Sequence, residues 1–360
     1  MTEPRLHLRG VVLPGGAERD VFVGGDRRIS FDAAAGDART VAEGVFLLPG
    51  LVDAHAHLTI GANLRAVGDE GVRVNADANV AAGVLLVREP GGASHATAGA
   101  AGSAGAPRLQ SAGRWLAARD AFLPGWGREV AEGELAGAAV DELTTAGGGW
   151  AKVIGDWRRD DVFRPSFSAD ALAAATRAVH DAGGRIAIHA IMAETVEMAV
   201  SAGCDSIEHG TFASDEAVAV MASRGMALTP TIGAVLEPPP PGAPAVVRER
   251  AAAAATTIRT TVRKAWEAGA TLMAGTDITI PHGEVRREIE LLASSGIPAE
   301  AALAAGSWGA RAFLGLPGIE EGAPADLVAF VRDPREDLAT LADPVIVVLD
   351  GGLIPGGEPA

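Results

Sequence analysis

The stretch Pro49–Leu58, PGLVDAHAHL, is an apolar run that ends in two histidines one residue apart. Side chains of a β-strand alternate between its two faces, so His55 and His57 are expected to point the same way. Two imidazoles that converge on one buried point are costly unless a group such as a metal ion occupies the space between them. The stretch therefore predicts a buried strand that ends in a candidate metal site.

Seven further segments also contain a short apolar run. In the second half of the chain, each of these apolar runs comes shortly after a glycine. A helix that ends at a left-handed glycine and is soon followed by a buried strand is typical of a helix-to-strand step. Helices are expected between the strands, as in 168–183 and 214–225, which begin with serine and end with glycine. The eight segments are GLVDAHAH (50–57), GVLLVREP (83–90), PRLQSAG (107–113), WAKVIGD (150–156), AGGRIAIHA (182–190), AGCDSIEHG (202–210), RGMALTPTIG (224–233) and AGATLMAGTD (268–277).

Eight such strands predict an α/β fold, a (β/α)8 TIM barrel over residues 49–324, with functional residues at the C-terminal ends of the strands. A doubly wound sheet is the alternative. Residues 1–48 and 325–360 contain short strands and glycine turns, which predict one small composite β-sandwich domain made from both termini. The proline-rich segment 237–245, EPPPPGAPA, is expected to be an extended loop, either a spacer or a lid over the strand ends.

Composition limits the class of protein. A hydrophobic fraction of 48% over 360 residues indicates a globular chain, and the apolar runs are too short for a bilayer span. The first residues lack a secretory signal, so a soluble, cytoplasmic protein is expected. Cys204 is the only cysteine, which excludes an internal disulfide and a cysteine-based zinc site. The net charge of −16 disfavours nucleic acid and anionic membranes, so a small-molecule substrate is expected, and a homo-oligomer is left open.

Other candidate metal ligands end other strands. His189 ends the fifth strand, His209 the sixth and Asp277 the eighth. Lys152 lies within the fourth strand, where its ammonium group would repel metal ions at the barrel mouth. The conflict disappears if the neutral amine reacts with CO2 to form a carbamate, an oxygen ligand that can bridge two metals.

The segments LLPGLVDAHAHL, GVLLVREPGG, IEHG, AGTD, PHGEVRREIELL and GAPADLVAF together resemble the amidohydrolase superfamily, in its order and over nearly the whole chain. The similarity is greatest to the branch of imidazolonepropionase-related hydrolases and Xaa-Pro or Xaa-Arg dipeptidases with a carboxylated lysine. The resemblance implies two divalent metal ions, zinc being the expected element, with Asp277 as the catalytic proton shuttle. The implied ligands are His55, His57 and Asp277 for the first metal, His189 and His209 for the second, and carboxylated Lys152 between them.

The activity implied by the resemblance is hydrolysis of an amide or peptide-like C–N bond by a hydroxide held between the metals, in a dipeptide, an N-acyl amino acid or a cyclic amide. A lactonase or esterase is compatible with the same site. A deaminase is a weaker alternative, because Met192 stands where deaminases of the superfamily carry a glutamate. A noncatalytic binding protein on the same barrel is the alternative from another class.

Several positions depart from the family pattern. The chain has no tyrosine, so His282, just after the eighth strand, is the expected donor to the substrate carbonyl. The second strand ends in Glu89 where relatives often have aspartate. After the third strand, RWLAARDAFLPGWG (114–127) lacks the histidine that relatives often show, and with DWRRDDVFRP (156–165) it predicts an aromatic and cationic rim.

Two expectations concern charged side chains near strand ends. Arg88, Arg158 and Arg159 are candidates to bind a substrate carboxylate, with a solvated surface role as the alternative. Glu208 is expected to face away from His209 and to support a ligand or the barrel packing.

Overall fold

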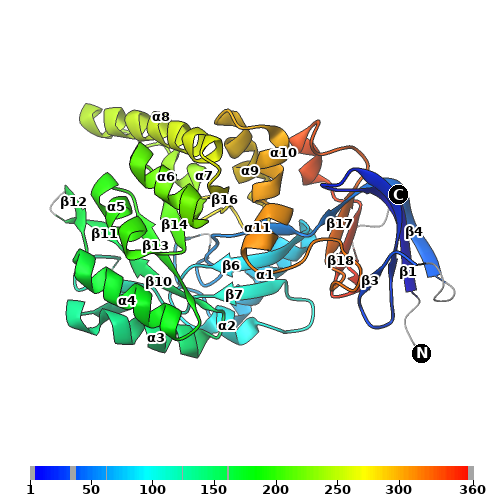
Figure 1. Ribbon diagram of the computed structural model, residues 1–360, viewed down its shortest axis with the longest axis horizontal. Coiled ribbons are helices and arrows are strands. Elements are labelled where there is room, and N and C mark those ends of the chain that lie inside the picture. Colours follow the sequence, from blue (N-terminus) through cyan, green and yellow to red (C-terminus); the bar gives the residue numbers. More distant parts are fainter. Residues whose placement is uncertain (1–4, 33–37, 62, 124, 160–161, 356–360) are drawn as a thin grey trace.

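A parallel barrel and a sheet built from both ends of the chain make up the protein, and they lie side by side (Figure 1). The computed structural model describes residues 5–32, 38–61, 63–123, 125–159 and 162–355. Parts of the predicted composite domain (1–4, 33–37 and 356–360) and of the predicted rim (124 and 160–161) lie outside the described residues.

Eight strand positions follow one another around the barrel in chain order. The third position is shared by β7 and β8 (Leu116–Ala118), and β8 pairs with both β9 (Arg128–Val130) and β10. The ring closes where Ala54 N donates to Ala274 O at 2.8 Å and Asp277 N donates to His55 O at 2.6 Å. The predicted (β/α)8 barrel is therefore confirmed, and the doubly wound sheet is wrong. The strands are β5 (Leu51–Asp53), β6 (Val84–Glu89), β7 (Arg108–Ser111), β10 (Trp150–Ile154), β13 (Arg185–Ala190), β14 (Ser206–His209), β15 (Ala227–Thr229) and β16 (Thr271–Leu272).

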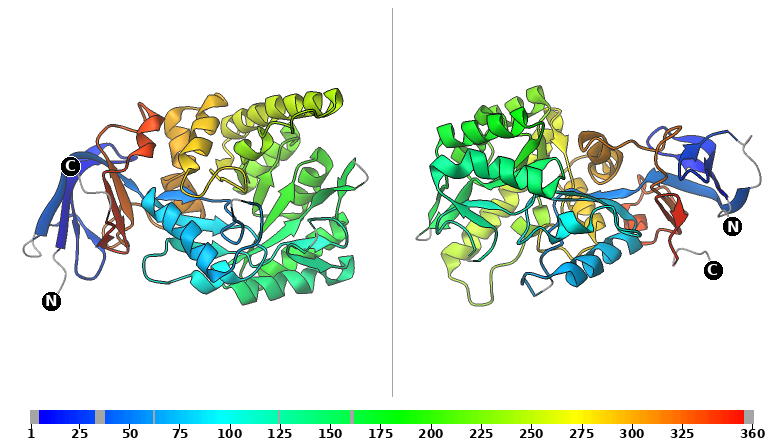
Figure 2. Two further views of the ribbon diagram at one scale, coloured as in Figure 1. Left: turned by 180° about the vertical axis from the view of Figure 1, so that it is seen from behind. Right: turned by 90° about the horizontal axis from the view of Figure 1, so that it is seen from below.

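Helices cover the outside of the barrel (Figure 2). Two of them begin where the sequence predicts, because the hydroxyls of Ser168 and Ser214 accept hydrogen bonds from Ala171 N and Ala217 N, each at 3.2 Å. The helices are α1 (Asp69–Ala81), α2 (Ala96–Ala100), α3 (Leu135–Ala146), α4 (Ala169–Asp181), α5 (Ala193–Ala202), α6 (Asp215–Arg224), α7 (Ile232–Val235), α8 (Ala245–Glu267), α9 (Val285–Ser294), α10 (Ala299–Ala305) and α11 (Trp308–Phe313).

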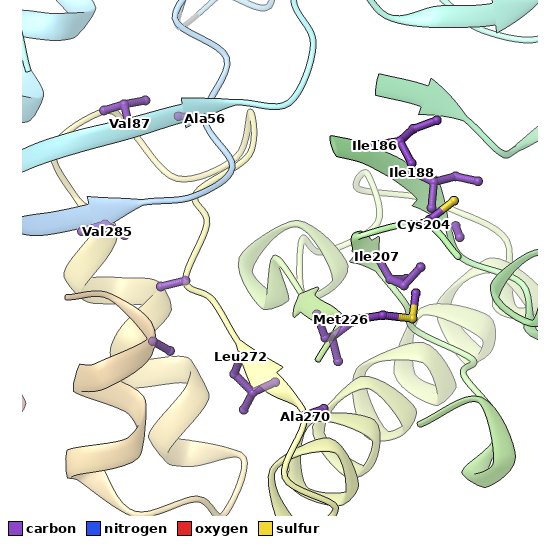
Figure 3. Close-up of a cluster of buried hydrophobic side chains, with 14 of the residues drawn as sticks. Ala56, Val87, Ile186, Ile188, Cys204, Ile207, Met226, Ala270, Leu272 and Val285 are labelled. Atoms are coloured by element: carbon purple, nitrogen blue, oxygen red, sulfur yellow. The ribbon is translucent and has the colours of Figure 1, made fainter. Parts of the chain in front are cut away.

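Alternation along the strands separates two cores. Ile186 and Ile188 of β13 belong to the large apolar layer between strands and helices (Figure 3), whereas Ala187 belongs to the cluster inside the barrel. The inner cluster also contains Trp150 from the start of β10, packed with residues of α11. This packing fills the N-terminal end of the barrel, so only the C-terminal ends of the strands are left for a functional site.

The second part is one continuous seven-stranded sheet in the order β19-β18-β17-β4-β1-β2-β3. Strand β4 joins the two chain ends, because it pairs parallel with β1 and antiparallel with β17. The sheet encloses its own apolar core, and the domain boundaries at residues 48 and 325 stay a prediction. Its strands are β1 (Arg5–Val12), β2 (Ala17–Val23), β3 (Ile29–Ser30), β4 (Ala38–Pro49), β17 (Leu327–Phe330), β18 (Ile346–Leu349) and β19 (Gly352–Leu353).

The proline-rich segment is an irregular connection between α7 and α8, and α8 begins at Ala245. The predicted loop is thus confirmed, while its role as spacer or lid stays open. None of the helices in the described part of the chain combines the length and the apolar character needed to cross a membrane.

Candidate metal centre

The six residues predicted to bind metal line one cavity of about 120 Å³ at the C-terminal ends of the strands. They come from five strand positions and are at least nine-tenths buried, apart from the slightly more exposed Asp277. The sequence-based prediction that these residues converge is confirmed, and their roles as ligands stay a prediction. The residues are His55, His57, Lys152, His189, His209 and Asp277.

The first histidine pair is fixed in orientation by its inner ring nitrogens. Nδ1 of His55 lies 2.6 Å from Glu208 Oε2, and Nδ1 of His57 lies 2.7 Å from the carbonyl oxygen of Gly91. Each ring therefore keeps Nε2 free to face Asp277 Oδ1, at 3.9 Å for His55 and 3.2 Å for His57. Ligand atoms of these three residues lie within 4.8 Å of one another, so the group can hold a metal ion.

The second pair consists of His189 and His209, whose ring centres lie 4.5 Å apart. It lies beside the first pair, because the ring centres of His55 and His209 are 5.3 Å apart. Burial, followed by the neighbouring His189, lowers the pKa of His209 well below its usual value, which favours the neutral form that binds metals. His189 Nε2 is buried, 3.4 Å from Asp156 Oδ1, and has no hydrogen-bond partner among the described residues. The buried carboxylate of Asp156 therefore faces this ring nitrogen and can orient the imidazole.

Thr231 orients His209. Its Oγ1 lies 2.7 Å from His209 Nδ1, and its backbone adopts a left-handed φ of 45° to bring the hydroxyl there. We expect Thr231→Ala to weaken zinc binding by roughly 10–100-fold, because the ring loses the partner that fixes its tautomer. Competition with a chromogenic chelator measures the affinity, and Thr231→Ser is the matched control that keeps the hydroxyl. Equal affinities of the alanine and serine variants would contradict the role of this hydrogen bond.

Lys152 is buried inside the barrel at the level of the histidines. Burial is the main cause that lowers the pKa of its amine to about 8, and Arg88 adds to it, whereas Glu208 and Asp277 oppose it. A neutral amine is the form that reacts with CO2, so the setting suits a carbamate. The chain contains thirty lysine and arginine residues, of which only Lys152 and Lys264 are lysines.

Asp277 is held in position by the segment around it. Its φ is 53°, and the preceding Thr276 donates to the buried Asp53 through its backbone N at 3.1 Å and its Oγ1 at 2.6 Å. Burial opposes ionisation of Asp277, but His55 and His57 outweigh it and hold the pKa of this carboxyl well below its usual value. Asp53 was missed as a site residue, although alternation puts it on the same strand face as His55 and His57.

Arg88 and Glu208 form a buried pair beneath the histidines. Arg88 Nη2 donates to both oxygens of Glu208, at 2.8 and 2.9 Å, and its Nε donates to Ala54 O at 2.6 Å. The hypothesis that Arg88 binds a substrate carboxylate is therefore wrong, because the guanidinium is fully buried, does not line the cavity and is paired with Glu208. Glu208 faces the interior by alternation with the outward Ile207, and the positive φ of 70° at His209 turns the histidine inward as well, so the expectation that the two residues face opposite ways is wrong. The contact of Glu208 with His55 agrees with the predicted supporting role.

Glu288 on α9 fixes the turn that contains Thr231. Its two carboxylate oxygens accept from Ile232 N at 2.5 Å and from Gly233 N at 3.0 Å. Burial, opposed by these two hydrogen bonds, raises the pKa of Glu288 to about 8. No sequence pattern predicted this contact, because it joins a helix to a turn more than fifty positions earlier in the chain.

The raised pKa predicts a pH-dependent stability of the metal-free protein. Below the usual value of 4.5 the carboxyl of Glu288 is protonated in both states, and between 4.5 and about 8 only the folded state keeps the proton. Its contribution to stability is thus complete below 4.5 and is lost as the pH rises to about 8, by up to about 1.4 kcal/mol per pH unit. We expect Glu288→Gln to remove this part of the slope in urea unfolding. Glu290→Gln, at a partly exposed position of the same helix, is the control, and parallel curves for parent and Glu288→Gln would refute the assignment.

Other predicted residues lie outside the cavity. His282 does not line it, since its Nε2 lies 3.5 Å from Ile60 O, and its role in substrate binding stays a prediction. Glu89 accepts from the backbone N and Oγ1 of Thr59, both at 3.1 Å, and so supports the chain after His57. The remaining histidines pair with carboxylates elsewhere, as expected for surface or structural residues: His7 with Asp20, His95 with Glu142 and His180 with Asp205.

Comparisons with known proteins agree with this geometry. An uncharacterized protein of Mycobacterium tuberculosis is 37% identical over 355 residues, which cover 96% of this chain and 95% of the relative. A Xaa-Pro dipeptidase with methionine bound in its active site superposes with a TM-score of 0.83 at 26% identity, covering 98% of this chain and all (100%) of that one. The ochratoxinase of A. niger shares the fold, with a TM-score of 0.83 at 20% identity over 97% of this chain and 95% of its own. The model of the amidohydrolase family matches residues 46–354. The predicted resemblance is confirmed, and the chain belongs to the amidohydrolase family.

Proposed function

We propose that the protein is a metal-dependent hydrolase that cleaves an amide or peptide-like C–N bond. The observation that supports this proposal is the convergence of two histidine pairs, Asp277 and the buried Lys152 on one cavity. The similarity to a Xaa-Pro dipeptidase at 26% identity supports a C–N bond as the target. A small molecule is the proposed substrate, while a cytoplasmic location and a homo-oligomer stay predictions.

The donor set is suited to two divalent ions, for which zinc is proposed. His55, His57 and Asp277 would hold one ion, His189 and His209 the other, and carboxylated Lys152 would contact both. Divalent ions at this site polarise a substrate carbonyl and lower the pKa of a bound water toward neutrality.

The residues of the chain supply orientation and proton transfer. Glu208 and Gly91 hold His55 and His57 through Nδ1, so that Nε2 of each ring faces Asp277, and Thr231 contacts Nδ1 of His209. Asp277 is ionised and takes a proton from the attacking water, then returns it to the nitrogen that leaves. The water oxygen forms a bond to the carbonyl carbon, the C–N bond breaks, and the products are a carboxylic acid and an amine. No oxidant or reductant is needed.

The alternatives differ in what they need from the cavity. An esterase or lactonase would use the same residues, because the carbon attacked is again a carbonyl. A deaminase would need a proton carrier after the fifth strand, but Met192 there forms the start of α5 and offers only its backbone N, which donates to Asp156 Oδ2 at 2.9 Å. This observation disfavours deamination.

The proposal is tested by measuring amine release from N-acyl amino acid amides with an amine-reactive dye. The zinc-loaded protein is expected to release the amine, the chelator-treated protein to lose this activity, and zinc to restore it. Release of acid from esters alone would favour the esterase, ammonia from aminated heterocycles would favour the deaminase, and zinc binding without turnover would favour a binding protein.

A further inference from the structure

One wall of the cavity consists of aromatic rings. Trp115, Phe122 and Trp126 come from the segment around β8, and Trp157 comes from β11 (Asp156–Arg159), which forms a hairpin with β12 (Val162–Pro165). We call these four residues the aromatic wall. Their ring centres lie 5.6 Å apart for Trp115 and Trp126, 5.4 Å for Trp115 and Phe122, and 4.7 Å for Phe122 and Trp157.

The aromatic wall reaches both histidine pairs. The Trp115 ring lies 4.9 Å from the His57 ring, and the Trp157 ring lies 5.6 Å from the His189 ring. Gly91 permits this approach, because a Cβ at that position would meet Trp115 Cδ1 at 2.7 Å. A molecule bound at the metal-binding side chains would therefore contact the wall directly.

The backbone beside Trp115 is held by the carboxylate of Glu142. Arg114, next to Trp115, donates through its backbone N to Glu142 Oε2 at 2.9 Å and through Nη2 to Glu142 Oε1 at 2.7 Å. His95 Nε2 holds the same carboxylate at 2.7 Å. A rigid aromatic surface costs little conformational entropy on binding, so stacking contributes more to affinity.

The wall is also more than core packing. Phe122, Trp126 and Trp157 are only partly buried, and they belong to a small cluster separate from the large core of the barrel. Three of the six tryptophans of the chain line this one cavity.

Charge in the cavity is confined to the predicted metal site. Among the described residues that line it, Lys152 is the only lysine or arginine, and every residue outside the metal-binding group is apolar. Arg159 shares the strand face of Trp157 but does not line the cavity. A substrate carboxylate placed against the wall would thus lose its hydration without gaining a cation, which is costly.

We propose that the substrate is an uncharged amide with a flat aromatic group beside the scissile bond, and that the aromatic wall binds this group. The inference rests on the proposed hydrolase function. Water again adds to the carbonyl carbon and its proton goes to the leaving nitrogen, so the products are an acid and an amine.

The test compares amides that differ in one feature. Benzoylglycinamide carries the ring on the acyl side and acetylaniline on the amine side, acetylglycinamide has no ring, and benzoylglycine adds a carboxylate. We expect kcat/KM of the zinc-loaded protein for at least one ring-bearing neutral amide to exceed that for acetylglycinamide and for benzoylglycine by about tenfold, the size of one good stacking contact. Binding of the same four compounds to the chelator-treated protein, measured by quenching of tryptophan fluorescence, is expected to rank their affinities in the same order.

Variants connect the preference to the wall. Trp157→Leu should lower kcat/KM for the preferred aromatic amide about tenfold more than for acetylglycinamide. Trp266→Leu, at an exposed position of α8, should change neither value. Equal turnover of acetylglycinamide, or a preference for benzoylglycine, would overturn the inference and leave the hydrolase intact. If no probe is hydrolysed, the proposed function fails for these amides, and the fluorescence order alone then supports or refutes the aromatic site.

Discussion

Replacement of Lys152 by alanine should reduce the zinc content of protein purified with zinc and bicarbonate from two ions per chain to one or none. Without the carbamate, only the imidazoles of His189 and His209 remain for the second ion. Activity should fall by more than the roughly 10–100-fold loss that outer partners of metal ligands cause, since the variant removes a proposed ligand itself. Elemental analysis per chain and kcat/KM for an amide substrate measure the two effects.

The chain offers a matched control, because Lys264 is the only other lysine. Lys264 is partly exposed on α8, outside the cavity lining, and pairs with Asp215 at 2.5 Å, so Lys264→Ala should retain both the zinc and the activity. Growth with carbon-13 bicarbonate should give one carbamate resonance that Lys152→Ala abolishes and Lys264→Ala keeps. Two ions in both the parent and Lys152→Ala would show that the lysine is no ligand. One ion in both would refute the bridge and indicate a mononuclear site.

The barrel could be predicted because its repeating steps are local. A glycine after a helix, a short apolar strand and a polar residue at the strand end lie within about ten positions, and propensity and burial act together there. The third strand is the weakest pattern, and the structure divides it between β7 and β8. The β domain was predicted from the strands of both termini, although only the long strand β4 explains how those termini meet.

The convergence of the candidate metal-binding residues could be predicted because all of them except Lys152, which lies within β10, lie at strand ends, and the strand ends of a barrel share one mouth. The residues that hold this group in place could not, since their contacts join distant positions. Glu288 reaches Ile232 and Arg88 reaches Glu208 through tertiary packing alone. Alternation also fails at His209 and Asp277, where positive φ values of 70° and 53° redirect the side chains.

Replacement of Asp277 by asparagine should lower kcat by roughly 10²–10⁴-fold, the usual contribution of a positioned general base. Asparagine keeps the size and one ligand oxygen of the side chain but cannot take up the proton of the attacking water. His55 and His57 remain in the variant, so at least one zinc ion per chain should stay bound. Asp215→Asn, the exposed partner of Lys264, is the matched control and should retain full activity.

The zinc content and the pH profile of Asp277→Asn separate its two proposed roles. If the variant keeps its zinc but loses turnover, the result supports proton transfer by Asp277. If the variant loses zinc in proportion to activity, Asp277 acts as a ligand only. In the chain without metal, His55 and His57 hold the pKa of the Asp277 carboxyl well below its usual value against the effect of burial, and a bound cation would lower this pKa further, so the parent should lose activity only at pH values below the ordinary aspartate range. The residual activity of the asparagine variant should lack this acidic limb, because no carboxylate remains there to be protonated. Full activity of Asp277→Asn with zinc bound would transfer the proton-accepting role to another group.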